Sequence, residues 1–156
     1  MYFWKIKQLK QHLIEHGLTE TQLFYYILIY VALSVIGMEV VGYFPHTEPD
    51  SWAYFDSVLN ILIPVIGTIA AFYANGGSAG SKFAERYFAI GFVITMRFTA
   101  LLIPLVVLLA IYLGFTSEVE NEAFIASPHI EFQIFLIWYA AMYVFIVKHI
   151  SNVANA

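Results

Sequence analysis

A glycine-rich segment at residues 73–87, YANGGSAGSKFAERY, contains residue types that many proteins use to hold phosphate. A nucleotide-binding P-loop needs the order G-x-x-x-x-G-K-[ST] directly after a buried strand. In this chain the lysine follows the serine, and an apolar segment of helical length takes the place of the strand. The segment therefore predicts a turn between two helices and excludes a nucleotide-binding loop.

Residues of this turn have predicted structural roles and one possible binding role. Asn75-Gly76-Gly77 is typical of a helix stop, because these residues tolerate positive φ angles. Ser81 is a natural N-cap for the next helix. The free N–H groups at that helix start, with Ser81, Lys82 and Arg86, could also contact a lipid phosphate or another anion. Both interpretations, a structural turn and a lipid or anion contact, stay open.

The segment HLIEH at residues 12–16 matches the reversed zinc-protease pattern H-x-x-E-H. In such a site His12 and His16 would be metal ligands and Glu15 would be the general base. Those proteases also need a third ligand and a substrate cleft, whereas this motif lies on the polar face of a short terminal helix. We interpret it as a solvated helix face, and we expect neither a metal site nor a cofactor.

Arg97 interrupts a long apolar segment, residues 83–115, and its depth in the membrane has two interpretations. If the membrane begins near residue 83, Arg97 lies about 20 Å along the helix, deep in the core. A charge at that depth needs partners inside the bundle. The candidates on neighbouring helices are Asn60, Asp56 and Glu39, which together with Arg97 form a predicted intramembrane polar cluster.

The second interpretation places the membrane boundary near Phe98, so that FTALLIPLVVLLAIYLGF spans by itself. Arg97 then lies at the cytoplasmic interface. Residues 83–96 are too apolar to be solvated alone, so they would pack on the N-terminal helix or on another subunit.

The composition requires these residues to be positioned by membrane helices. The chain has 156 residues, of which 61% are hydrophobic and only 12% are charged. Soluble domains have about 45–50% apolar and about 25% charged residues. So few charges cannot cover a water-facing surface, and we therefore expect an integral membrane protein. The chain has no cysteine, which excludes disulfides and thiolate chemistry.

Four segments are long and apolar enough to span a bilayer, which takes about 20 residues. We place them at residues 21–44, 51–74, 83–115 and 128–149. Thr19 and Gln22 form a plausible capping box before the first span. Pro128 stands at a favoured first helical position before the last.

Lysine and arginine residues indicate the orientation of the spans. They precede the first span, lie in or after the loop between the second and third spans, and close the fourth: Lys5, Lys7, Lys10, Lys82, Arg86, Arg97 and Lys148. The other two connections, residues 45–51 and 116–131, are acidic and contain neither lysine nor arginine. Because cytoplasmic loops carry the excess of these residues, both termini should be cytoplasmic.

The N-terminal segment, residues 1–17, has the pattern of a basic amphipathic helix. Its apolar residues share one face: Tyr2, Ile6, Leu9 and Leu13. Such a helix suits the cytoplasmic membrane surface, and docking against a neighbouring subunit is an equal alternative. Gly17 is expected to end it.

The predicted fold is therefore all-α: one membrane domain, residues 1–156, forming a four-helix transmembrane bundle. We expect a non-enzymatic, multi-pass membrane protein that acts by assembly, as a homo-oligomer or as a small subunit of a membrane complex. The alternatives are a channel or transport protein built around the polar cluster and a lipid-modifying enzyme. The expected partners are membrane lipids and either further copies or another membrane protein, with no nucleic acid. The expected location is the bacterial inner (cytoplasmic) membrane.

Overall fold

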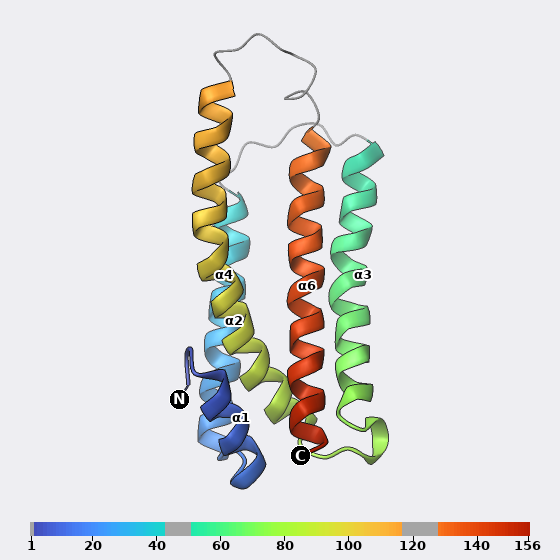
Figure 1. Ribbon diagram of the computed structural model, residues 1–156. Coiled ribbons are helices and arrows are strands. Elements are labelled where there is room, and N and C mark those ends of the chain that lie inside the picture. Colours follow the sequence, from blue (N-terminus) through green and yellow to red (C-terminus); the bar gives the residue numbers. More distant parts are fainter. Residues whose placement is uncertain (1, 43–50, 117–127) are drawn as a thin grey trace.

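The computed structural model describes residues 2–42, 51–116 and 128–156, and these residues are helical with short connections (Figure 1). They form five α-helices and one short 3₁₀ helix, with no strand in the described part: α1 (Ile6–Glu15), α2 (Glu20–Gly42), α3 (Ser51–Ala74), η1 (Gly77–Ala79), α4 (Phe83–Thr116) and α6 (Pro128–Ala154). The predicted all-α class is confirmed. Most of the two acidic connections lies outside the described residues.

The helix boundaries lie close to the ends of the predicted spans, except at the C-terminus. Helix α6 continues past His149, where the predicted span ends, to Ala154. The reason is packing, because Ile150 and Val153 are both buried. Lys148 is a charged residue within this helix, and the helix does not end there.

Three of the helices are long and apolar enough to cross a membrane. Their qualifying stretches are Ser57–Ala74, Phe83–Leu108 and Phe135–Ala154. The described apolar part of α2, Glu20–Ile36, is shorter. A span through α2 therefore stays a prediction.

The capping box at the start of α2 is confirmed. The backbone N–H of Thr19 donates to Gln22 Oε1 at 3.1 Å, and the backbone N–H of Gln22 donates to Thr19 Oγ1 at 3.3 Å. These two bonds satisfy backbone donors that an uncapped helix start leaves unpaired. They fix the point at which the chain leaves α1 and enters α2.

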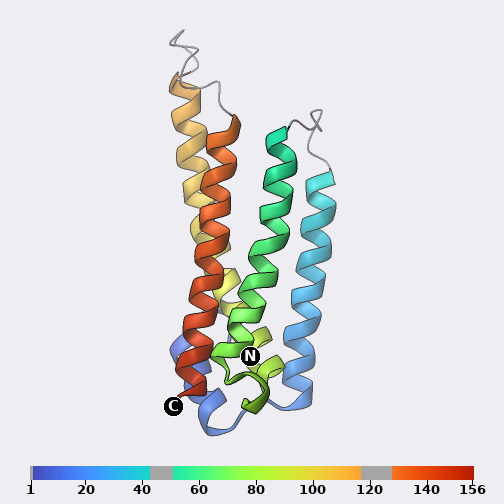
Figure 2. The same ribbon diagram turned by 90° about the vertical axis from the view of Figure 1, so that its right-hand side faces the viewer.

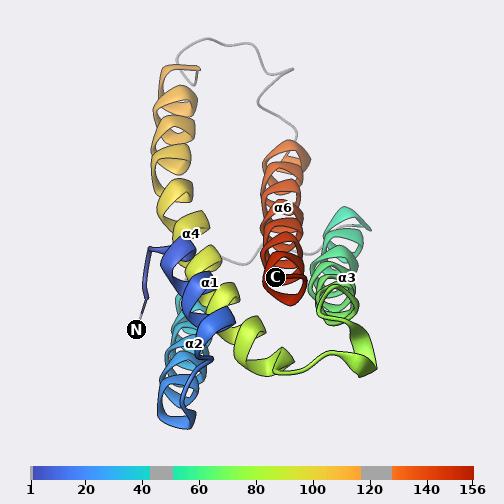
Figure 3. The ribbon, with the colours of Figure 1, turned by 60° about the horizontal axis from the view of Figure 1, so that its bottom comes forward.

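The long helices pack as two pairs that are joined through α4 and α6. Helix α2 packs on α4, α3 packs on α6, and α6 also packs on α4. Figures 1 and 3 show α6 between α3 and the upper part of α4. Helices α3 and α4 are consecutive in the chain, but η1 and the inclined start of α4 carry α4 away from α3.

Both ends of the described chain lie at one end of the bundle, shown at the bottom of Figures 1 and 2. We call this the basal end; it comprises α1, the turn at residues 75–82 and the last turns of α6. The basic residues of α1 and of the turn are gathered here, in agreement with the charge pattern of the sequence.

The buried core also lies toward the basal end. Helix α1 buries Ile6, Leu9 and Leu13, which confirms its predicted apolar face, and it packs on α4 and α6. The most continuous buried stretch of α4 is Ala89–Ile94. The first half of α4 thus packs on the N-terminal helix of the same chain. The apolar face of α1 is covered by this contact, so neither the membrane surface nor a second subunit is needed to bury it.

Away from the basal end, large apolar side chains are exposed along the described helices. Examples are Val35 on α2, Ile61 on α3, Leu108 on α4 and Ile137 on α6, each about 60–70% exposed. A water-soluble protein rarely exposes so much contiguous apolar surface. In a bilayer these side chains would face lipid, which agrees with membrane association.

Candidate functional site

Arg97 contacts the segment that precedes α1. Its Nε donates to the backbone carbonyl oxygen of Trp4 at 3.0 Å, and its Nη2 donates to the same oxygen. The guanidinium carbon also lies 5.6 Å from the centroid of the Trp4 ring, within cation–π range. The N-terminal segment therefore gives Arg97 a partner that could not be predicted from the sequence. Every residue has a backbone carbonyl, so no residue pattern indicates which one accepts the hydrogen bond.

The other members of the predicted polar cluster are placed differently. Asn60 is exposed on α3, and no hydrogen bond joins it to Arg97. Helix α6 separates the outer parts of their two helices (Figure 3). The side chains of Asp56 and Glu39 lie outside the described residues. A cluster that contains all four residues stays a prediction. The described contacts of Arg97 are with Trp4 in the N-terminal segment.

A buried asparagine forms two side-chain hydrogen bonds in the turn between α3 and α4. Asn75 is only 3% exposed. Its Oδ1 accepts a hydrogen bond from Arg86 Nη1 at 2.8 Å, and its Nδ2 donates to the backbone oxygen of Ser81 at 3.1 Å. One asparagine therefore ties the end of α3 to the turn and to the first turns of α4.

A second contact ties this turn to the junction between α1 and α2. Glu85 is buried, and its Oε1 accepts a hydrogen bond from the backbone N–H of Leu18. The ends of the Lys82 and Glu85 side chains both lie beside Gly17, whose φ of +72° ends α1 as predicted. Glu85, in the first turn of α4, thus connects segments that are distant in the chain.

The predicted N-cap and the predicted anion-contact residues lie in the turn before α4, and the structure corrects the first of these two predictions. Helix α4 begins at Phe83, so the expected N-cap at Ser81 was wrong, and Lys82 takes that position with a φ of +56°. The Ser81 backbone oxygen is instead held by Asn75. Ser81 and Lys82 are exposed, whereas Arg86 binds Asn75. Contact with a lipid phosphate or another anion stays a prediction, for which Lys82 is the accessible cation.

Within the HLIEH segment Glu15 and His16 are exposed and His12 is partly exposed, whereas Leu13 belongs to the buried face of α1. The His12 and His16 rings stack with centroids 5.4 Å apart, and Glu15 Oε2 lies 3.7 Å from His16 Nδ1. Among the described residues, no group of three or more histidine, cysteine, aspartate or glutamate side chains could hold a metal. The interpretation of this motif as a helix face agrees with that geometry.

Hydroxyl groups meet where the helices pack in the interior. Thr68 Oγ1 on α3 and the Tyr87 hydroxyl on α4 lie 2.8 Å apart, a hydrogen-bonding distance. On α6 the rings of Tyr139 and Tyr143 pack edge to face, with centroids 5.4 Å apart. These two residues are one turn apart on the same helix, and Tyr139 also packs, partly buried, against the hydrophobic core. The gathering of these hydroxyl residues from α3, α4 and α6 had no sequence signal, because they come from distant segments.

A cavity of about 470 Å³ lies between α2, α4 and α6. Six of its lining residues carry hydroxyl groups: Tyr30, Ser34, Thr95, Thr99, Tyr139 and Tyr143. The other described lining residues are apolar. This volume falls within the range of about 300–1,000 Å³ that is typical of small-molecule sites.

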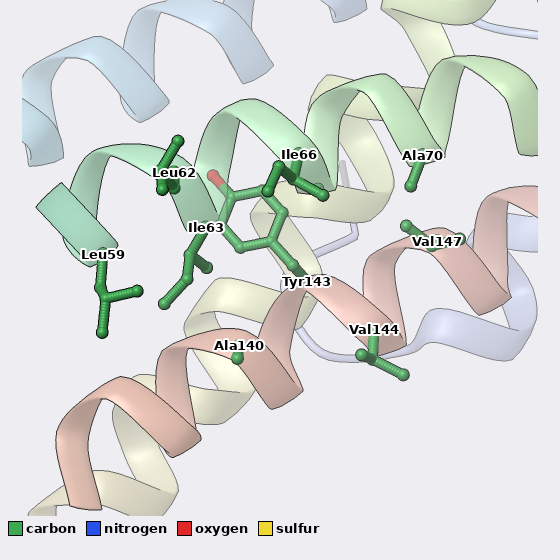
Figure 4. Close-up of a pocket in the computed structure, with 10 residues that line it drawn as sticks. Leu59, Leu62, Ile63, Ile66, Ala70, Ala140, Tyr143, Val144 and Val147 are labelled. Atoms are coloured by element: carbon green, nitrogen blue, oxygen red, sulfur yellow. The ribbon is translucent and has the colours of Figure 1, made fainter. Parts of the chain in front are cut away.

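A second, almost entirely apolar groove of about 410 Å³ runs between α3 and α6 (Figure 4). Tyr143 extends from α6 toward α3, where it meets Gly67 (Figure 4). The absence of a side chain at Gly67 lets the tyrosine ring pack directly on the α3 backbone. A small residue at a helix interface allows this kind of close approach.

No protein-family model, curated protein or solved structure matches this chain, so its function is inferred from the arrangement of its own residues.

Proposed function

We propose that the chain is a four-span, multi-pass membrane protein with both termini in the cytoplasm, and that it acts by assembly without enzymatic activity. Its partner would be a further copy or another membrane protein. The gathering of the basic residues of α1 and the turn at the basal end supports the orientation. The length and apolar character of α3, α4 and α6 support the membrane location.

The observation that carries the assembly proposal is Asn60. It lies well inside α3, about 13 Å from the Ser51 end and about 21 Å from the Ala74 end by helical rise. Its side chain is exposed and has no hydrogen-bond partner among the described residues. An amide in hydrocarbon is stabilised by a hydrogen bond across a helix interface, worth about 1–2 kcal/mol in model membrane helices. We therefore infer that a partner covers this part of α3.

The test is the oligomeric state of the full chain in lipid nanodiscs, measured by single-molecule counting. Asn60→Leu should weaken association about tenfold, because one interhelical hydrogen bond is lost. Asn60→Gln keeps the amide and should retain association. Tyr73→Phe, at an exposed position near the basal end of α3, is the matched control and should have no effect. A wild-type protein that is monomeric in native lipid and retains no partner during purification would contradict the proposal.

The channel or transport alternative has less support, because Arg97 binds the N-terminal segment instead of a described residue of α3. It predicts ion or solute flux in liposomes that falls when Arg97 or Asp56 is replaced by alanine. We expect no such dependence, and flux that is lost in either variant would favour the channel. A lipid-modifying enzyme has no support from the contacts described above.

A further inference from the structure

The hydroxyl-lined cavity between α2, α4 and α6 has the chemistry of a site for one class of ligand. Three tyrosines and three smaller hydroxyl residues line it, and none of the lining residues that the structure describes is charged. A charged ligand head would therefore find no countercharge in its walls, which is costly away from water. A neutral polar head can use the hydroxyl groups.

Some of this hydrogen-bonding capacity is already used within the protein. The Ser34 hydroxyl donates to the backbone oxygen of Tyr30 at 2.9 Å, and Thr95 Oγ1 donates to Met142 Sδ at 3.6 Å. The rings of Tyr139 and Tyr143 pack edge to face, with centroids 5.4 Å apart. A tyrosine hydroxyl can donate one hydrogen bond and also accept one. Tyr30 forms no described side-chain hydrogen bond, so its O–H is also free to donate.

The shape of the site follows from the burial of its walls. Phe92, Met142 and Tyr143 are buried, whereas Leu33, Ser34 and Thr99 are exposed. The cavity therefore has a closed floor and an open rim. The rim residues lie within the apolar helices, so the opening faces hydrocarbon when these helices are in a bilayer. Aromatic rings at the floor and sides favour a flat head.

We propose that this cavity binds an uncharged, lipid-soluble molecule whose flat head accepts hydrogen bonds from Tyr30 and Tyr139. Its apolar tail leaves through the rim into the bilayer. The proposal is independent of assembly through Asn60, which lies on another helix and does not line the cavity.

The experiment measures fluorescence quenching of Trp138, next to Tyr139 in α6, by a benzoquinone that carries a decyl tail. The full chain is used in nanodiscs with the other two tryptophans replaced by phenylalanine, which leaves one fluorophore. We expect saturable quenching. Tyr30→Phe combined with Tyr139→Phe keeps both rings, removes both hydroxyls and should weaken binding about tenfold. Tyr73→Phe, outside the cavity, should leave the affinity unchanged.

Two competitors define the chemistry of the head. Decylbenzene has the same tail without a carbonyl acceptor, and decyltrimethylammonium carries a charge; both should compete poorly with the quinone. Quenching that rises linearly without saturation would indicate partition into the bilayer only and overturn the proposal. An unchanged affinity in the double variant, or equal competition by decylbenzene, would show an apolar occupant and overturn it as well.

Discussion

Gly67→Ala is expected to lower the free energy of unfolding by about 2 kcal/mol. An added Cβ would lie 2.2 Å from Tyr143 Cδ1 and 2.9 Å from Tyr143 Cβ. The tyrosine is buried, so the ring and the α6 backbone must both shift. Overpacking of this kind costs about 3 kcal/mol at the upper end of its usual range. The higher helix propensity of alanine offsets about 1 kcal/mol of this cost. The measurement is unfolding in mixed micelles during titration with a denaturing detergent, followed by circular dichroism.

Gly91→Ala is the matched control for this prediction. Gly91 is also a helical glycine, on α4, but an added Cβ there meets nothing within 4 Å. Only the helix-propensity effect should remain, which raises the free energy of unfolding by about 1 kcal/mol. The two substitutions should therefore have opposite signs. A Gly67→Ala protein as stable as the wild type would show that α3 and α6 do not meet at this position.

The second large effect is expected for Glu85→Ala, which should lower the free energy of unfolding by about 2 kcal/mol. The substitution removes the acceptor for the Leu18 N–H, at the junction of α1 and α2. Hydrogen bonds to charged groups contribute about 1.5–3 kcal/mol, and a donor left unpaired adds its own cost. Because the contact holds the α1–α2 junction against α4, amide hydrogen exchange in α1 should also become faster.

Two variants separate this contact from a general effect of charge. Glu15→Ala removes a carboxylate that is half exposed on α1, so it should change stability by less than about 0.5 kcal/mol. Glu85→Gln keeps an acceptor oxygen and should be milder than Glu85→Ala. If Glu85→Ala left α1 exchange unchanged, the α1–α2 junction would not depend on this carboxylate.

The local elements of this fold could be predicted because their signals are local in the chain. Apolar runs of span length placed α2, α3 and α4 closely, and Thr19 and Gln22 formed the capping box that their spacing indicated. The same holds for the stop at residues 75–77, where Gly76 and Gly77 have positive φ angles. In each case the cause lies within a few residues, so no knowledge of distant contacts was needed.

The surroundings of the polar residues could not be predicted in the same way. Arg97 was assigned carboxylate and amide partners because these are the partners that a sequence displays, yet it binds the backbone oxygen of Trp4. The order of the helices in space also mattered. Because α6 lies between α3 and α4, residues at matching depths on consecutive helices need not meet (Figure 3).

The sequence by itself determined that this chain is helical, that its helices are apolar enough for a membrane, and where most of them begin and end. Those properties depend on the composition of each segment and on the spacing of its apolar residues, and both can be read directly from the sequence. Only the tertiary structure decided that α1 covers the first half of α4, that Glu85 and Asn75 hold the basal end together, and that tyrosines from α2 and α6 line a common cavity. These features depend on which faces of distant segments meet, and that is decided by packing among all the helices at once.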